Sequence, residues 1–417
     1  PRKKSKAMTD HRLKSPASRT LQVILTVMTL LLLLQNYVLA ASQQMTPQEL
    51  QAFGKQIQET ATAQDPAKFR ALFDRKTFIN RVLAEYEQNS AVKQAIQPVR
   101  QQLEAAYTGE NQGIDSEILA EVANGADYRF LAMRKEDDQF KVIFRFLRPD
   151  WTLNYQALII EKQDSGELKI IDIDSFSTGE LISQSLQRVY LPELYKAHGA
   201  NQDKLTPEQK TRILDQKKRY DFLTVTDEKA DPFQAYSQLP SQYKSDKTVL
   251  LFLAQDSIAK EDSKKYQQVL NVFRKYHPQD PAAEMLSVDY FSMEKQYPQA
   301  IDCLERLSAS LKTVDPYLYS LRAGILIEMG DTSLAAKYAG KASEIEPDLL
   351  QPYLHLLNIS VLQGNFDETI KHLETLKTKF GFAYEDLDLS ELENIEKFTA
   401  SPQFKKWQSE KLPPKAE

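Results

Sequence analysis

Cysteine and histidine are scarce in this sequence of 417 residues. It contains one cysteine, Cys303, and five histidines, which are scattered along the chain. A single cysteine excludes an intramolecular disulfide and a thiolate metal cluster. HExxH, CxxC, Walker and GxSxG motifs are all absent, so the usual signatures of metalloproteases, P-loop enzymes and serine hydrolases are missing. We therefore predict no catalytic residue, no metal site and no cofactor, and we expect that the protein is not an enzyme.

Glycine is also sparse, with 12 residues, whereas Leu, Gln, Lys, Glu and Ala are plentiful. Glycine weakens helices and the abundant residue types favour them, so the composition indicates a mainly helical protein. The chain is 42% hydrophobic and 27% charged, which is typical of a globular protein. Its length predicts two or three domains.

A basic surface is missing from most of the chain. Residues 1–40 hold seven of the 53 basic residues and one of the 58 acidic residues, which leaves a net charge of −11 for the remainder. Nucleic-acid binding depends on a basic footprint that neutralises phosphates. The acidic body of this protein therefore argues against a nucleic-acid partner.

One long apolar run lies near the N-terminus. Residues 1–20 are basic, residues 21–34 (LQVILTVMTLLLLL) are almost entirely apolar, and Val38-Leu39-Ala40 precedes Ala41 as a small-residue cleavage site. This order is typical of a secretory signal peptide. The alternative is a retained inner-membrane anchor over residues 21–40, although a transmembrane helix needs about 20 apolar residues. We expect a periplasmic or secreted protein, whose only membrane contact is this segment when it is not cleaved.

The next segment, residues 41–178, predicts helices followed by strands. Thr46-Pro47-Gln48-Glu49 is a capping box that starts a helix ending near Thr62, and Asp65-Pro66 starts a second. After Asn124-Gly125 the apolar period changes from 3.6 to 2. Four strands are expected, over residues 128–135, 139–147, 151–162 and 167–175, joined by short turns into an antiparallel meander with one apolar face. Lys141 and Arg145 fall on the opposite, polar face, and Thr178 to Tyr190 returns to helix.

This order of elements resembles the nuclear-transport-factor-like, or cystatin-like, α+β cone over about residues 46–178. That fold includes enzymes, ligand binders and interaction modules, so it does not fix function. Asp172 and Asp174 alternate on the last strand and would suit acid–base work on a concave face. We favour the simpler interpretation, in which they lie at a strand end near solvent. Three tyrosines would line such a pocket or belong to the core: Tyr107, Tyr128 and Tyr155.

Residues 179–245 predict a helical connector. Thr206-Pro207-Glu208-Gln209 starts a helix, and its basic run Lys217-Lys218-Arg219 is interpreted as a solvated helix face. Asp231-Pro232 and Leu239-Pro240-Ser241 are interpreted as linkers.

Residues 246–400 contain a repeat of 34 to 35 residues. Met329-Gly330-Asp331 recurs as Gln363-Gly364-Asn365, and Lys295 occupies the place of Gly330 one repeat earlier. Helical patterns of similar form lie between these turns, over residues 247–280, 281–314, 316–347 and 350–383. Ala323, Ala335 and Ala339 are small residues where paired helices would cross. Leu389–Phe398 is expected to form a capping helix, and the tail, residues 401–417, to pack back through Phe404 and Trp407.

The repeats resemble the tetratricopeptide repeat family. The resemblance implies a right-handed α-solenoid whose concave groove, lined by the first helix of each repeat, binds a protein or peptide. By position the groove residues would be Leu251, Gln255, Ile258, Met285, Asp289, Ser292, Tyr317, Ser320, Gly324, Gln351, Leu354 and Asn358. The two-lysine clamp for carboxylates is not evident, so acidic C-terminal peptides are not expected as ligands. The alternative is a solenoid that only packs against the N-terminal domain.

The expected fold is therefore mainly α, with an α+β N-terminal domain of helices and a four-stranded antiparallel sheet. The expected function is that of an exported bacterial envelope scaffold or adaptor. One alternative is a small-molecule binder or hydrolase-like enzyme that uses a pocket in the cone, with the repeats as a docking arm. Another is a structural protein whose repeats mediate self-association.

Overall fold

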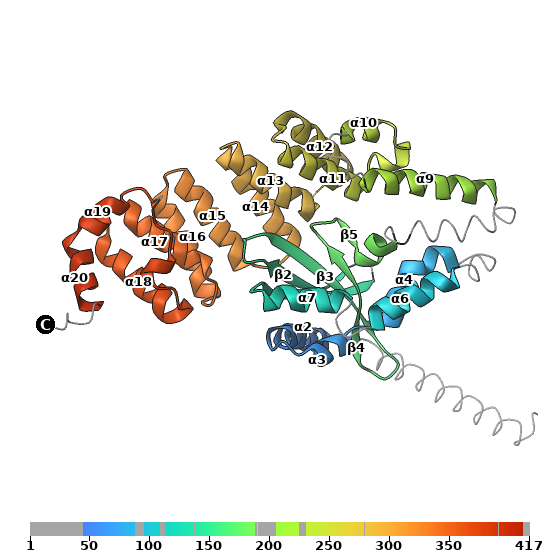
Figure 1. The fold of residues 1–417 in the computed structure, drawn as a ribbon, viewed down its shortest axis with the longest axis horizontal. Helices are drawn as coiled ribbons and strands as arrows, with labels where there is room; N and C mark the ends of the chain where they lie inside the picture. The colour runs from blue at the N-terminus through green and yellow to red at the C-terminus, as the bar shows by residue number, and fades with distance from the viewer. Residues whose placement is uncertain are drawn as a thin grey trace, which may run out of the picture.

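A computed structural model of the chain describes residues 45–87, 96–108, 113–136, 138–187, 190, 206–224, 231–278, 280–390 and 392–411. The predicted signal segment, residues 1–40, and the end of the tail from residue 412 lie outside these residues. A stack of helical hairpins, α11 to α18, lies alongside a β-sheet whose other face is covered by the N-terminal helices (Figure 1).

In the described residues before the sheet there are five helices, and their starts follow local sequence signals. They are α2 (Pro47–Thr62), α3 (Pro66–Ala71), α4 (Arg75–Glu87), α6 (Gln97–Thr108) and α7 (Ile114–Ala123). The predicted capping box at Thr46 is confirmed, because its side chain accepts from the Glu49 N–H while Glu49 accepts from the Thr46 N–H at 2.8 Å. Asp65 caps α3. Sequence analysis did not identify α7, which contributes Ile118 and Leu119 to the core.

The antiparallel meander is confirmed, with one more strand than expected. The strands are β1 (Asp127–Glu136), β2 (Gln139–Leu147), β3 (Leu153–Lys162), β4 (Leu168–Ser175) and β5 (Glu180–Leu181), in the order β1-β2-β3-β4-β5. The expectation of four strands was wrong because the segment from Thr178 was expected to be helical. Glu180 and Leu181 instead pair with the end of β4, and the helix follows over residues 182–187.

Both faces of the sheet are buried, although one apolar face was expected. Phe144 and Leu158 face the N-terminal helices in one core, whereas Ile143, Tyr155 and Ala157 pack towards the repeats in another. The strand register pairs Ile143 with Ala157 and Val142 with Leu158. Consequently Phe144 of β2 and Tyr155 of β3 lie on opposite sides of the sheet. The alternation within one strand does not show how neighbouring strands are aligned, so the sequence alone could not predict this.

The connector contains α9 (Pro207–Leu223), α10 (Pro232–Ser237) and a 3-10 turn, η2 (Ser241–Tyr243). Asp231-Pro232 does not form a linker. Asp231 caps α10, since its side chain accepts from the Phe233 N–H, and Pro232 occupies the first turn. Proline is favoured there because its missing N–H would have no helical partner.

The four predicted repeats are confirmed as four helical hairpins. They are α11 (Lys247–Ala259) with α12 (Ser263–Tyr276), α13 (Pro281–Met293) with α14 (Tyr297–Leu311), α15 (Pro316–Glu328) with α16 (Thr332–Ile345), and α17 (Gln351–Leu362) with α18 (Phe366–Phe380). Ala323, Ala335 and Ala339 are fully buried where α15 and α16 pack. Small side chains at these positions let the two helix backbones approach.

Every hairpin turn has one residue with positive φ. These are Glu261 (φ 53°), Lys295 (φ 56°), Gly330 (φ 80°) and Gly364 (φ 67°). A left-handed residue is needed to reverse the chain between helices, and glycine adopts it without strain. The first two repeats therefore keep the turn with the less suitable residues Glu261 and Lys295.

The end of the solenoid differs from the prediction. A 3-10 turn, η3 (Tyr384–Asp386), precedes α19 (Ile395–Ala400) and α20 (Pro402–Lys411), so the capping helix begins at Ile395 and not at Leu389. Phe398, Phe404 and Trp407 pack against α17 and α18 in one apolar cluster. The expected packing of Phe404 and Trp407 is confirmed, and it shields the last repeat from solvent.

Candidate partner-binding surface

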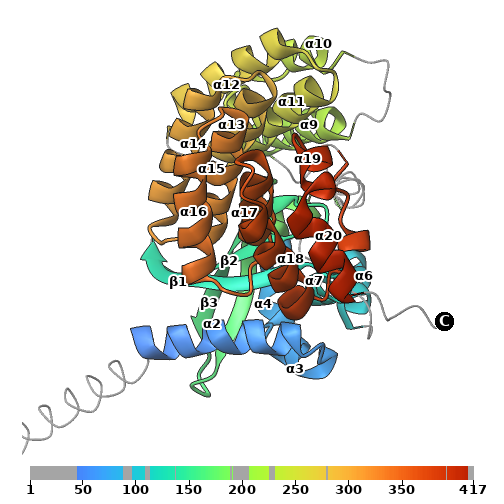
Figure 2. The same cartoon turned by 90° about the vertical axis from the view of Figure 1, so that its left-hand side faces the viewer.

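The first helix of each repeat lies on one side of the stack. Figure 2 shows α12, α14 and α16 along the outer side and α11, α13, α15 and α17 along the other, which we call the inner surface. All twelve predicted groove residues belong to these four helices. Their exposure decides which of them can meet a partner.

The predicted residues divide into three groups by exposure. Leu251, Tyr317 and Ser320 are buried. Those half-buried are Ile258, Met285, Ser292, Gly324, Gln351, Leu354 and Asn358, and those exposed are Gln255 and Asp289. Leu251 is covered by the segment after β4, since a Cβ added at Gly179 would lie 2.4 Å from its Cδ1 atom. A partner would therefore meet the polar residues Gln255 and Asp289 first.

The N-terminal domain packs against the loops that join the repeats. Arg134 donates to the Ser310 carbonyl at 3.2 Å, and Arg129 pairs with Asp348 at 2.7 Å. Leu147 of β2 shares an apolar cluster with Tyr317 and Leu349. These contacts involve the last turn of α14, the first turn of α15 and the loop between α16 and α17. The sheet thus occupies the edge of the solenoid.

Arg145 is the centre of this interface. Its guanidinium is fully buried and lies 2.7 Å from Asp315, 2.6 Å from Asp127 and within hydrogen-bond distance of Glu346. The Tyr155 hydroxyl donates to the second oxygen of Asp315 at 2.6 Å. Burial alone would lower the pKa of Arg145, but the surrounding carboxylates raise it well above its ordinary value. A residue predicted on the polar face of the sheet is therefore a buried cation.

Asp289 is the charged group of the inner surface. Its side chain is exposed, yet desolvation by the surrounding protein raises its pKa to about 6. No other group contributes to that shift, and none of the described residues forms an ion pair with it. Asp289 is therefore a carboxylate set among protein atoms but open to solvent, without a counter-ion in the described part of the chain.

Two acceptor atoms on α17 also lack donors. Gln351 Oε1 and His355 Nε2 are buried without a hydrogen-bond partner among the described residues. Desolvation lowers the pKa of His355 to about 4, although a hydrogen bond to the Ser320 backbone opposes this. A neutral imidazole accepts at the nitrogen that carries no proton. His355 was not among the predicted residues. It packs closely against α15 at Gly324, where an added Cβ would lie 3.2 Å from His355 Cε1.

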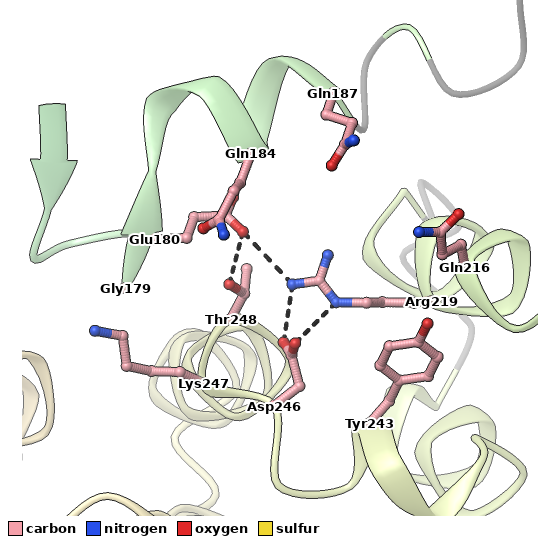
Figure 3. A pocket seen from close by; sticks show the side chains of 10 residues that line it. All are labelled: Gly179, Glu180, Gln184, Gln187, Gln216, Arg219, Tyr243, Asp246, Lys247 and Thr248. Atoms are coloured by element: carbon pink, nitrogen blue, oxygen red, sulfur yellow. Dashed lines mark hydrogen bonds and ion pairs between the residues drawn. The ribbon is translucent and has the colours of Figure 1, made fainter. Parts of the chain in front are cut away.

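A separate cavity of about 270 Å³ lies where β5, α9 and α11 meet (Figure 3). Arg219 of α9 crosses it and donates to both oxygens of Asp246 at 3.0 Å, with Glu180 at 3.5 Å. Thr248 donates to Glu180 at 2.9 Å. Glu180 and Asp246 raise the pKa of Arg219 despite its burial. Arg219 is therefore part of a joint between connector and repeats and does not lie on a solvated face, whereas Lys217 and Lys218 are exposed.

The carboxylates considered for acid–base chemistry have structural partners. Asp172 is buried, lies 2.7 Å from Arg81 and accepts from the Ser183 hydroxyl at 2.6 Å. Asp174 lies 3.8 Å from Lys141. These contacts tie β4 to α4, to the helix after β5 and to β2.

The three tyrosines considered as pocket residues are buried in packed regions. Tyr128 stacks on Phe144 with ring centroids 4.4 Å apart, and its hydroxyl donates to Gln156 at 3.0 Å. Tyr107 belongs to the cluster of α4 and α6, and Tyr155 to the interface with the repeats. The space inside the sheet is thus filled by side chains such as Phe144.

Within the described ranges, no group of three or more His, Cys, Asp or Glu side chains is arranged to hold a metal ion. His355 and His372, on α17 and α18, form no such group. In the same part of the chain, no helix has the length and apolar character needed to cross a membrane.

Three solved structures resemble part of this chain. MamA gives a TM-score of 0.33 at 20% identity, covering 40% of this chain and 94% of its own. YrrB, described as a TPR protein with an unusual peptide-binding site, gives 0.29 at 13% identity, covering 35% of this chain and 74% of its own. PilW, described as a widely conserved type IV pilus biogenesis factor, gives 0.32 at 11% identity, covering 42% of this chain and 89% of its own.

No protein-family model matches the sequence, and no curated protein matches it. The helix bounds and the turns of the structure define the hairpins of residues 247–380.

Proposed function

We propose that this protein is an exported scaffold or adaptor of the bacterial envelope, which binds another polypeptide through the inner surface of its repeats. One observation carries the proposal. The N-terminal domain docks on the loops at the edge of the solenoid, and it leaves Gln255 and Asp289 exposed on the inner helices. The domain and a partner would therefore occupy different surfaces of the same solenoid.

The N-terminal domain would act as a brace for the repeats. Repeat arrays are stabilised mainly by contacts between neighbours and tend to flex along their length. Here the sheet contacts the loops after α14 and after α16 through Arg145, which pairs with both Asp315 and Glu346. Fixing the spacing of repeats in advance lowers the conformational cost of binding. A braced inner surface suits an adaptor that presents one defined shape.

The enzymatic alternative has less support. Its candidate carboxylate, Asp172, is satisfied by Arg81 and Ser183, and its candidate pocket is filled by the aromatic core. Export is supported by the sequence of residues 1–40 alone, through the basic segment, the apolar run and the small residues that follow.

Site-specific photo-crosslinking tests the proposal. A benzoylphenylalanine would replace Gln255 on the inner surface or, as a matched control, Glu344, which is exposed on the outer helix α16. Ultraviolet irradiation in the native envelope should give defined adducts from position 255 and few from position 344. Equal adducts from both positions, or none from position 255, would contradict binding through the inner surface.

A phosphatase fusion tests export separately. Alkaline phosphatase, which is active only outside the cytoplasm, would be joined after residue 45. High activity in cells is expected, and low activity would contradict export whatever the result of crosslinking.

A further inference from the structure

The cavity between β5, α9 and α11 is polar on every side. Its volume is about 270 Å³, and its described lining consists of three glutamines, one tyrosine, one threonine, one glycine and four charged residues. None of these lining residues has an aliphatic hydrophobic side chain, whereas pockets for drug-like ligands are mainly apolar. An occupant would therefore have to form hydrogen bonds over most of its surface.

The charged residues of the lining neutralise one another. Two of them are acidic, Glu180 and Asp246, and two are basic, Arg219 and Lys247. Lys247 also lies 3.0 Å from Asp280, which is not part of the lining. The cavity thus has no excess of positive charge to attract an anion, and an anionic ligand would be repelled by two carboxylates.

The oxygens of both carboxylates already have donors. Glu180 accepts from the Thr248 hydroxyl at 2.9 Å through one oxygen and from the Ser185 hydroxyl through the other. Asp246 accepts from Arg219 through both oxygens, at 3.0 Å each. A cationic ammonium group has donors and no acceptor, so in this cavity it would meet carboxylates that are already engaged.

The groups that remain free are mainly donors. Arg219 Nη1 forms no hydrogen bond with the described residues, and Figure 3 shows the guanidinium in the middle of the cavity with Gln187 above it. Gln184 accepts from the Leu181 N–H at 3.2 Å through Oε1, so its amide nitrogen is left without a described partner. Gln187 forms no hydrogen bond with the described residues. Donors thus outnumber acceptors among the free groups.

The occupant that suits these conditions is uncharged, polar over its whole surface and rich in acceptors. A sugar unit meets the first two conditions through its hydroxyl groups. Since a cavity of about 150 Å³ admits benzene, the volume of about 270 Å³ has room for one substituted sugar ring. An acetamido group meets the third condition, because its carbonyl oxygen accepts two hydrogen bonds.

We propose that this cavity binds one N-acetylhexosamine unit, with Arg219, Gln184 and Gln187 as its donors. The bound sugar would contact α9, the helix after β5 and the start of α11, so it would hold the connector to the first repeat. The site is separate from the inner surface proposed above for a polypeptide, and neither proposal depends on the other.

Ligand-observed NMR on the purified full chain tests the proposal, with saturation transfer to detect binding and titration to measure affinity. The expected ligand is N-acetylglucosamine. Three probes change one property of the same ring: glucose lacks the acetamido group, glucosamine is a cation and glucuronate is an anion. Acetamide alone tests whether the ring contributes to binding.

Two variants and one control locate the site. Gln187→Ala removes a side chain that bonds to no described residue, so it should not disturb folding. Arg219→Lys keeps a cation beside Asp246 and removes the free Nη1 donor. The matched control is Gln268→Ala, which is exposed on α12. Thermal unfolding without ligand reports any loss of stability, and Gln187→Ala keeps the test decisive if Arg219→Lys weakens the joint.

We expect N-acetylglucosamine to bind at least about fivefold more tightly than each of the other probes. Gln187→Ala should weaken this binding about threefold to tenfold, Arg219→Lys at least about tenfold, and Gln268→Ala less than about twofold. At about ten times its dissociation constant, the sugar should raise the midpoint of thermal unfolding by about 3 °C.

Several results would overturn the proposal. One is the absence of binding by N-acetylglucosamine, and another is equal binding by glucose, glucosamine or glucuronate. An affinity that neither Gln187→Ala nor Arg219→Lys reduces would place the sugar elsewhere on the protein. Equal affinity for acetamide would show that the cavity recognises an amide carbonyl and not a sugar.

Discussion

Arg145 of β2 lies 2.7 Å from Asp315, the residue that caps α15, and both side chains are fully buried. The two residues are 170 positions apart in the sequence. Asp315 also accepts from the Tyr317 N–H and from the Tyr155 hydroxyl. A single carboxylate thus joins the sheet, the start of α15 and the wall of the inner surface, and it couples the shape of the repeats to the N-terminal domain.

Replacing Arg145 with methionine should strongly destabilise the protein. The substitution leaves Asp315 and Glu346 buried without their cation, and breaking a buried pair from one side costs about 3–5 kcal/mol. Urea unfolding followed by circular dichroism measures the change, and the repeats should separate from the sheet as a second transition. The control is Arg148→Met, whose partner Glu121 is at 3.4 Å on the surface; it should cost less than about 1 kcal/mol. Similar losses in both variants would contradict the central role of Arg145.

Glycine at the turns of the first two repeats should stabilise the solenoid. Lys295 and Glu261 have φ of 56° and 53°, a conformation that costs a side-chain-bearing residue about 1–2 kcal/mol. The added freedom of glycine in the unfolded chain offsets part of this, so a gain of about 0.5–1 kcal/mol each is expected. Thermal unfolding provides the measurement. Gly330→Ala is the reciprocal control, because an added Cβ meets no atom within 4 Å and only the backbone cost remains. Stabilisation by Gly330→Ala would refute the explanation.

Gly179→Ala should loosen the contact between the end of the sheet and the first repeat. An added Cβ would lie 2.4 Å from Leu251 Cδ1 and 2.8 Å from Lys247 Cε, at a φ of 67°. Overpacking and backbone strain together should cost about 2–4 kcal/mol. Gly166→Ala, at φ of 89° with nothing within 4 Å, isolates the backbone contribution of about 1 kcal/mol. Calorimetry on both variants distinguishes the two costs, and equal losses would mean that Leu251 yields easily.

The stability difference between the original chain and Asp289→Asn should depend on pH. The pKa of Asp289 is about 6 in the folded protein, raised by desolvation, against 3.8 in the unfolded chain. The folded state therefore holds this proton more tightly, so stability falls as pH rises from the unfolded pKa of 3.8 to the folded pKa of about 6 and stays at the lower level above it. Because the side chain is exposed and screened by water, a gain of no more than about 1 kcal/mol is expected from Asp289→Asn at pH 8.

That gain should shrink towards pH 5, and it should vanish below the unfolded pKa. Tyr317 and Tyr266 are the titratable groups that respond to Asp289, and both remain neutral across this range. Chemical unfolding at pH 8 and pH 5 provides the test. A gain that is constant with pH would show that Asp289 is ionised throughout.

The repeat architecture could be read from the sequence because its signals are local. The period of 34 to 35 residues, the alanines at the helix crossings and the glycine turns act within one hairpin, and Asp or Thr caps act within four residues. Even the degenerate first repeat forms its hairpin, since Glu261 adopts the turn conformation that glycine would favour. The face of each inner helix followed from the same period, so the positions of Gln255 and Asp289 could be predicted as well.

The tertiary structure decided what those positions can do. A strand pattern shows that residues alternate but not which face is covered, so Arg145 was placed on the polar face of the sheet although Asp315 and Glu346 enclose it. The same long-range packing covers Leu251 with Gly179 and brings the Trp151 carbonyl to the Tyr317 hydroxyl. It leaves Asp289 without an ion pair among the residues that the structure describes. Sequence determined each hairpin through contacts a few residues apart, whereas burial and charge pairing depend on segments more than a hundred residues apart, whose proximity only the folded chain establishes.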